Sequence, residues 1–148
     1  MIAIEAMCGS ARLASCLKKV GFDAVGVDFK GCKDVPEKGV KVLWIDISTK
    51  QGQKEFWELI KSSNVVYVHF APPCGTATRA REIRRKFKVP GVGTVDPPPL
   101  RSDDCPDGLP GLSRDNEQRV ISANLIYEFV ADMVIALSDR KIAWSVEN

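Results

Sequence analysis

Apolar and polar positions alternate along the chain in a pattern that predicts strands and helices in turn. Short, nearly continuous apolar runs, as expected of buried parallel strands, occupy residues 2–7, 24–28, 40–46, 64–70 and 142–148. Between the first two runs, Leu13, Leu17 and Val20 follow helical spacing and predict a helix over residues 10–20. Strands that alternate with helices predict an α/β fold with a mainly parallel sheet and right-handed crossovers.

Two further helices are predicted in the rest of the chain. Phe56, Leu59 and Ile60 form the apolar face of a short helix after the third strand. A longer helix is expected to begin near Ser113 or Asp115, because either side chain can cap its N-terminus. Its predicted buried stripe comprises Val120, Asn124, Tyr127, Ala131 and Val134, widened by Ile126, Val130, Met133 and Leu137.

Length and composition fit one soluble domain. The chain has 148 residues, of which 45% are hydrophobic and 27% are charged. Residues 90–113, rich in proline and glycine, are predicted to be a long loop inside a domain of residues 1–148. No apolar run approaches the roughly 20 residues that span a bilayer, and no signal peptide is recognised. We therefore expect an intracellular protein without membrane contact, nuclear in a eukaryote and cytoplasmic in a bacterial or viral setting.

The cysteines and the single histidine argue against a metal site. Intracellular thiols stay mostly reduced, five cysteines cannot all pair, and none has C-x-x-C spacing. We interpret Cys8, Cys16 and Cys32 as packing residues and Cys105 as a loop thiol. His69 is interpreted as a buried residue with its hydrogen bonds satisfied. Three tryptophans are interpreted as core residues: Trp44, Trp57 and Trp144.

Polar or reactive residues follow every predicted strand at its carboxyl end. These ends carry MCGSA at residues 7–11, Asp28, Asp46, APPC at residues 71–74, and Glu147. The carboxyl ends of parallel strands lie on one edge of a sheet, and ligands of such sheets bind at that edge. The sequence therefore predicts a site there.

The first two strand ends suggest an adenosine ligand. A turn through Gly9 leads into a helix, whose N-terminal amides can bind a carboxylate or phosphate. Asp28 lies where an acidic residue would bind the two ribose hydroxyls, and Asp46 could accept from an adenine amino group. The full G-x-G-x-x-G fingerprint is missing, which favours an adenosine compound smaller than a dinucleotide. A plain helix-capping turn is the alternative.

Cys74 follows two prolines at the end of the fourth strand. A cysteine in such a place is most often a small packing residue, but the stiff turn made by Pro72 and Pro73 favours a nucleophile. Residues 79–88, RAREIRRKFK, carry six positive residues and one negative residue. Such a block is either a solvated surface or a segment that binds phosphates.

Together these motifs resemble the cytosine-C5 DNA methyltransferases, which use S-adenosylmethionine. MCGSARLASCLKKVGFDAVGVD (7–28) resembles their first motif, and WIDIS (44–48) their third. VVYVHFAPPCGTATRAR (65–81) resembles the motif with Pro-Pro-Cys, and WSVEN (144–148) the Glu-Asn motif. The motif order is kept. The resemblance implies a Rossmann-like class I methyltransferase fold, with helices on both faces of a mainly parallel sheet, truncated after the fifth strand.

The resemblance also assigns roles to residues. It implies that Cys74 adds to carbon 6 of cytosine and that Glu147 serves as acid or hydrogen-bond partner of N3. Contacts with S-adenosylmethionine, or its product S-adenosylhomocysteine, are implied for Met7, Cys8, Gly9, Ser10, Ala11, Asp28, Phe29, Asp46, Ile47 and Pro73. Contacts with a flipped-out nucleotide in DNA, expected ahead of RNA, are implied for Thr78, Arg79, Arg81, Arg84 and Arg85.

The chain departs from the family pattern at several points. Met7 stands where an aromatic residue usually packs on adenine, Ala11 replaces a glycine, and Gly75 replaces a glutamine. The target-recognition domain is missing, so completion by a partner subunit or by a missing C-terminal segment is considered. Two functions stay open: a methyltransferase domain acting on cytosine in DNA, and a non-catalytic module that binds the cofactor or a partner protein.

Overall fold

The computed structural model describes residues 1–62, 64–78 and 97–147 of the chain. Their contacts divide the chain into two compact units. The first unit comprises Met1–Pro72 and Leu125–Asn148, and the second comprises Pro73–Asn124. The boundary therefore falls between the two prolines of the Pro-Pro-Cys motif and again inside the last helix.

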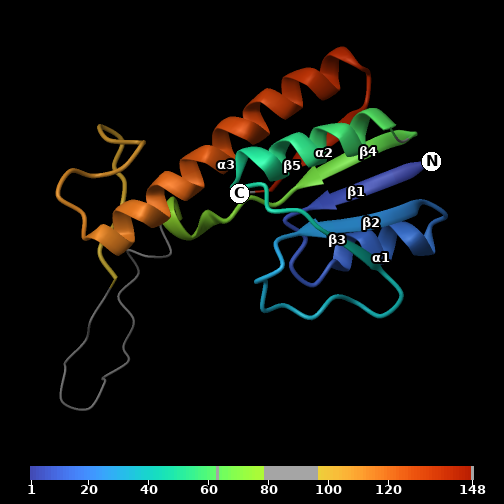
Figure 1. Ribbon diagram of the computed structural model, residues 1–148, viewed down its shortest axis with the longest axis horizontal. Coiled ribbons are helices and arrows are strands. Elements are labelled where there is room, and N and C mark those ends of the chain that lie inside the picture. The colour runs from blue at the N-terminus through green and yellow to red at the C-terminus, as the bar shows by residue number, and fades with distance from the viewer. Residues whose placement is uncertain (63, 79–96, 148) are drawn as a thin grey trace. The chain divides into compact units, whose positions relative to one another are not determined.

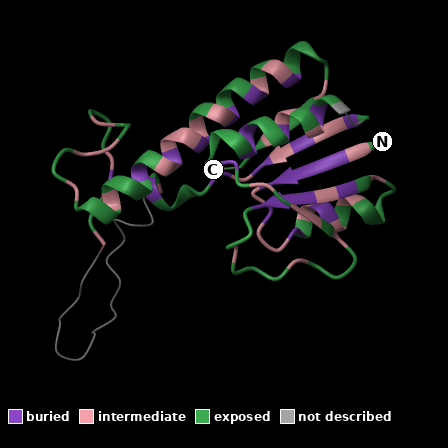
Figure 2. Ribbon diagram, in the orientation of Figure 1, coloured by how far each residue is buried: buried purple, intermediate pink, exposed green. Residues whose placement is uncertain are grey.

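The first unit contains a five-stranded, entirely parallel sheet in the order β3-β2-β1-β4-β5 (Figure 1). The strands lie close to the predicted ranges: β1 (Ile2–Ala6), β2 (Asp23–Asp28), β3 (Lys41–Trp44), β4 (Val65–Phe70) and β5 (Ala143–Val146). Central β1 is buried over most of its length, as expected of a strand flanked on both sides (Figure 2). The predicted α/β class with a parallel sheet is confirmed.

Helices cover both faces of this sheet. Helix α1 (Arg12–Lys19) packs on β1 and β2, where Ala3, Ala14 and Ala24 allow close approach. Helices α2 (Lys50–Ser62) and α3 (Arg114–Asp139) share the larger core on the opposite face. Phe56 of α2 and Phe70 of β4 lie at the centre of that core, with ring centroids 5.9 Å apart.

The buried stripe of α3 differs from the predicted one. Ser113 caps the helix as expected, since its Oγ accepts a hydrogen bond from the Asn116 amide. The residues predicted only to widen the stripe are its buried centre, namely Ile126, Val130, Met133 and Leu137. Tyr127, Ala131 and Val134 lie along one flank instead. By length and composition α3 could also cross a membrane, but its buried side chains pack against the sheet.

Two tryptophans predicted to lie in the core are exposed. Trp44 ends β3 and is 51% exposed, and Trp144 in β5 is 42% exposed. Both strands are edges of the sheet, so each has a neighbour on one side only. Only Trp57 packs against the core, as predicted.

The second unit is organised around the long loop. Leu100 is almost completely buried, and its carbonyl accepts a hydrogen bond from the Leu109 amide. Gly108 has a φ of +130°, and a Cβ there would lie 2.8 Å from a methyl of Val120. Residues 97–113 therefore fold back on the first turns of α3 as a compact loop.

Candidate functional site

The carboxyl ends of the strands in the first unit form one continuous edge. The chain passes from β1 to β2 on one side, and β4 pairs with β1 on the other side. The order therefore reverses between β1 and β4, which is where open parallel sheets bind their ligands. The turn after β1, Asp28 at the end of β2, and Glu147 after β5 all belong to this edge.

The turn after β1 is built from left-handed residues. Met7, Gly9 and Ala11 have φ angles of 57°, 50° and 55°. A Cβ on Gly9 would lie 3.2 Å from the Asp34 carboxylate, so glycine suits this position in both conformation and space. At Ala11 the same conformation costs about 1–2 kcal/mol, because its Cβ crowds the backbone. A glycine at this position would avoid that cost.

Asp28 joins this turn to β2. It is 6% exposed, and its Oδ2 accepts from the Gly9 amide at 2.7 Å while Oδ1 accepts from the Phe29 amide at 2.8 Å. Each carboxylate oxygen has two lone pairs, so Asp28 keeps acceptor capacity for ligand hydroxyls. Phe29, the next residue in the chain, is 48% exposed.

The other residues expected to bind the cofactor differ in exposure. Asp46 is exposed, and its Oδ1 accepts from the Ser48 amide and hydroxyl at the start of α2. Ile47 and Cys8 are buried, so neither side chain is presented to a ligand. Burial, and secondarily the charge of Asp28, raises the pKa of the Cys8 thiol to about 12, which keeps it protonated. Ser10 is half-buried, and its carbonyl accepts from the Glu37 amide.

Glu5 was not predicted to take part in this edge. Ala11 makes no side-chain cap for α1, and Glu5 of β1 supplies one, since its Oε2 accepts from the Ala14 amide at 2.6 Å. The helix N-terminus expected to bind a ligand anion therefore already holds a carboxylate. Burial raises the pKa of Glu5, although the amides of Ala14 and Leu13 act in the opposite direction.

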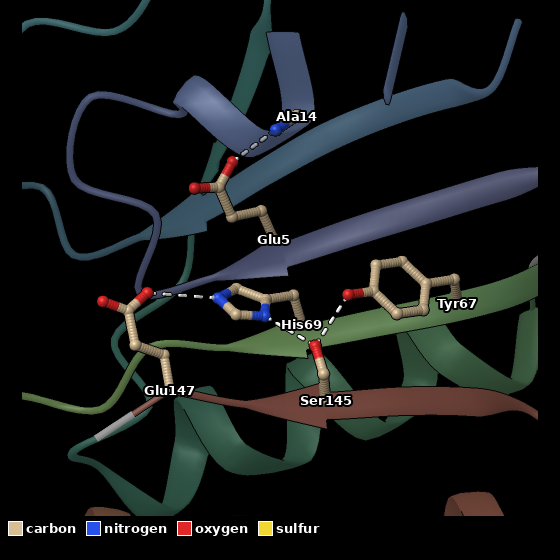
Figure 3. Close-up of polar contacts among 6 residues, drawn as sticks. All are labelled: Glu5, Ala14, Tyr67, His69, Ser145 and Glu147. Atoms are coloured by element: carbon tan, nitrogen blue, oxygen red, sulfur yellow. Dashed lines mark hydrogen bonds and ion pairs between the residues drawn. The ribbon is translucent and has the colours of Figure 1, made fainter. Parts of the chain in front are cut away.

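A chain of four polar side chains lies beside Glu5 (Figure 3). Tyr67 Oη lies 2.6 Å from Ser145 Oγ, which lies 2.7 Å from His69 Nδ1. His69 Nε2 lies 3.7 Å from an oxygen of Glu147. The prediction that His69 has a satisfied hydrogen bond is confirmed, but its partner Ser145, and the Tyr67 hydroxyl that bonds to Ser145, were missed. Their spacing of two residues from His69 and from Glu147 could have shown that each pair shares a face.

Cys74 lies at the start of the second unit, directly after Pro73. It is exposed and opens the single-turn helix η1 (Cys74–Thr76), and its carbonyl accepts from the Ala77 and Thr78 amides. Thr76 is buried, and its Oγ1 accepts from Arg101 Nη2 at 3.1 Å. Arg101 also donates to the Pro106 carbonyl, so a residue the sequence did not single out ties the cysteine turn to the loop.

The remaining predicted residues have varied placements. Pro73 is exposed and Thr78 is half-buried, both in the second unit. Cys16 is exposed, so its interpretation as a packing residue was wrong. Within the described part of the chain no three metal-ligating side chains gather, and the five cysteines are free thiols. The predicted contacts to nucleic acid at Arg79, Arg81, Arg84 and Arg85 fall outside the described residues.

No protein-family model matches the chain, and no curated protein or solved structure matches it either. Its function is therefore inferred from its own residues and their geometry.

Proposed function

We propose that the chain is a catalytic domain that transfers a methyl group from S-adenosylmethionine to carbon 5 of cytosine in DNA. One observation carries the proposal. The turn held by Asp28 and the carboxylate of Glu147 lie at the same carboxyl edge of a parallel sheet, on either side of the switch between β1 and β4. This supports a cofactor and a base-binding acid on neighbouring strand ends.

The residues after β1 and β2 fit the adenosine part of the cofactor. Asp28 has lone pairs left for the two ribose hydroxyls, and Phe29 offers an exposed ring for the adenine to stack on. Phe29 can thus serve where Met7 lacks an aromatic ring. Asp46 is exposed at the next strand end and can accept from the adenine amino group. When bound, S-adenosylmethionine supplies an electrophilic methyl group.

Cys74 is assigned as the nucleophile. Carbon 5 of cytosine is a weak nucleophile, and a thiolate that adds to carbon 6 converts the ring into an enamine. Carbon 5 then forms its bond to the methyl group, which leaves S-adenosylhomocysteine as the product. Loss of the carbon 5 proton to solvent and cleavage of the carbon–sulfur bond release 5-methylcytosine and the free thiolate. The exposed position of Cys74 supports this role.

Glu147 is assigned to N3 of the same ring. As the sulfur bonds to carbon 6, negative charge develops on the ring, and a carboxylic acid at N3 neutralises it by giving up its proton. Glu147 is 75% exposed, and its backbone amide is anchored to the Phe70 carbonyl at the end of β4. A fixed backbone with an exposed side chain suits a group that must meet an incoming base. The basic residues 79–88 are assigned to the DNA backbone.

The second candidate is a module that binds a partner protein without catalysis. A hollow of about 380 Å³ lies between the flank of α3 and the edge strand β5 in the first unit. Apolar side chains line it, among them Tyr127, Val134, Trp144 and Val146. Such surfaces on edge strands are typical of protein contacts.

Calorimetric titration with S-adenosylmethionine tests the proposal. We expect micromolar binding that Asp28→Ala weakens by about tenfold or more. Asp23→Ala is the matched control, because Asp23 is exposed at the opposite end of the same strand. Wild-type chain that shows no binding, or Asp28→Ala that binds as tightly as Asp23→Ala, would contradict the assignment of the cofactor edge and favour the partner-binding module.

A further inference from the structure

We propose that His69 is a positioning residue that orients the carboxyl group of Glu147 and determines which of its oxygens carries the proton. The inference rests on the proposed function, in which Glu147 protonates a cytosine ring. It concerns the chain Tyr67–Ser145–His69–Glu147, to which the resemblance assigned no role beyond Glu147 itself.

Strand register puts these groups on one face. Glu5, His69 and Ser145 are direct partners across β1, β4 and β5, so their side chains form one row (Figure 3). Tyr67 precedes His69 by two residues and Glu147 follows Ser145 by two, which places both on the same face. The His69 side chain is 13% exposed and that of Glu147 is 75% exposed. The row therefore leads from the interior to an open carboxylate.

The hydrogen-bond donors in this row can be ordered. A neutral imidazole has one N–H, and a bare Nε2 facing a carboxylate would place two acceptors together. The favourable tautomer therefore carries its proton on Nε2 and accepts at Nδ1. The Ser145 hydroxyl must then donate to Nδ1, and it accepts in turn from the Tyr67 hydroxyl. Every proton in the row points toward Glu147.

The order of the hydrogen-bond donors determines which oxygen of Glu147 carries the proton. Nε2 lies 3.7 Å from one oxygen, Oε2, of Glu147, which is longer than a hydrogen bond; in this proposal the exposed Glu147 side chain closes that distance, so that Oε2 accepts from Nε2–H. The proton of the neutral acid must then sit on the other oxygen, Oε1, which is free to donate to N3. That proton moves to N3 as the sulfur–carbon bond forms and returns to the same oxygen when the bond breaks. Glu5 is the other acidic group facing His69, and its carboxylate is held by the Ala14 amide.

The single histidine makes the tautomer directly measurable. Long-range nitrogen–proton NMR spectra of the full chain distinguish a proton on Nδ1 from one on Nε2. At pH ~8 we expect the Nε2–H form, a loss of this preference in Ser145→Ala, and a shifted Nε2 resonance in Glu147→Ala. Ser138→Ala, on α3 at the opposite face, should leave the imidazole signals in place. An Nδ1–H tautomer, or imidazole signals that neither variant moves, would overturn the inference.

Kinetic measurements distinguish a role of His69 in orienting Glu147 from a role in packing alone. His69→Gln keeps an N–H donor near the place of Nε2, whereas the shorter His69→Asn does not reach it. We expect methyl transfer to fall by about tenfold or more in His69→Asn and clearly less in His69→Gln, with cofactor affinity unchanged in both. Equal losses in both variants, together with weaker cofactor binding, would reduce His69 to a structural role. If the wild-type chain transfers no methyl group, the proposed function is wrong. The NMR spectra of the imidazole would then be the remaining test of the contact between His69 and Glu147.

Discussion

The carboxylate of Glu5 in β1 accepts a 2.6 Å hydrogen bond from the backbone amide of Ala14 in α1. Ala11 at the start of this helix has no side chain that can cap it. A side chain of β1 therefore caps α1, and the turn of residues 7–11, which belongs to the candidate site, connects these two elements. Because Glu5 is buried, this cap depends on pH.

Glu5→Gln should remove that dependence. Burial raises the pKa of Glu5 in the folded chain above its usual value, so the folded state holds the proton to higher pH than the unfolded state does. The contribution of Glu5 to the free energy of unfolding is then greatest below about pH 4.5 and falls as pH rises through the raised pKa. Glutamine still accepts from the Ala14 amide but cannot ionise.

Thermal unfolding between pH ~4.5 and ~8 measures this effect. The melting temperature of the wild type should fall relative to Glu5→Gln as pH rises. Glu128→Gln, at an exposed position of α3, should follow the wild type. A wild type that instead gains stability over Glu5→Gln with rising pH would show that the charged form is favoured by folding.

Gly26→Ala should disturb the packing under α1. A Cβ at residue 26 would lie 2.7 Å from the Cys8 sulfur and 3.2 Å from a methyl of Val42. We expect a loss of about 1–3 kcal/mol in the free energy of unfolding, measured with urea. In Gly26→Ala combined with Cys8→Ala, removal of the sulfur makes room for the new methyl. The double variant should lose less than the sum of the single losses, and strict additivity would mean that Cys8 is not the group in contact.

Arg101→Ala should loosen the turn that carries Cys74. Its guanidinium donates to Thr76 Oγ1 in a buried position and to the Pro106 carbonyl. We expect a loss of about 1–3 kcal/mol in local stability, seen as faster hydrogen exchange of the Ala77 and Thr78 amides. The matched control is Arg119→Ala, at an exposed position of α3. Unchanged exchange in Arg101→Ala would mean that the turn holds without this contact.

The fold could be predicted largely from local patterns, because buried parallel strands are continuous apolar runs and their carboxyl ends meet by topology. Which side of α3 is buried could not be predicted in this way. Apolar residues occur on every side of this helix, among them exposed Ile121 and Ile135, so the buried side is decided by packing on the sheet. Trp44 and Trp144 are exposed because they lie in β3 and β5, and the topology of the sheet decides that these two strands are its edges.

The sequence indicated which strand ends form the candidate site. It did not indicate which side chains lie opposite one another in paired strands. Asp28 ends β2 and Glu147 follows β5, so both could be found from the strand pattern of the sequence. The row of Tyr67, His69 and Ser145 depends on how β4 pairs with β5. Ser145 in β5 lies more than 70 positions after Tyr67 and His69 in β4. No local pattern specifies such a pairing.

Covalent trapping tests the central claim most directly. A DNA duplex carrying 5-fluorocytosine can take up the methyl group at carbon 5 but has no proton there to lose, so the carbon–sulfur bond cannot break. With S-adenosylmethionine present, mass spectrometry should find the methylated nucleotide attached to the peptide that contains Cys74. Cys16→Ser, which changes another exposed thiol, should still be trapped, and Cys74→Ser should not. Methyl transfer to ordinary cytosine DNA by Cys74→Ser, or a wild-type chain that forms no adduct, would contradict the account.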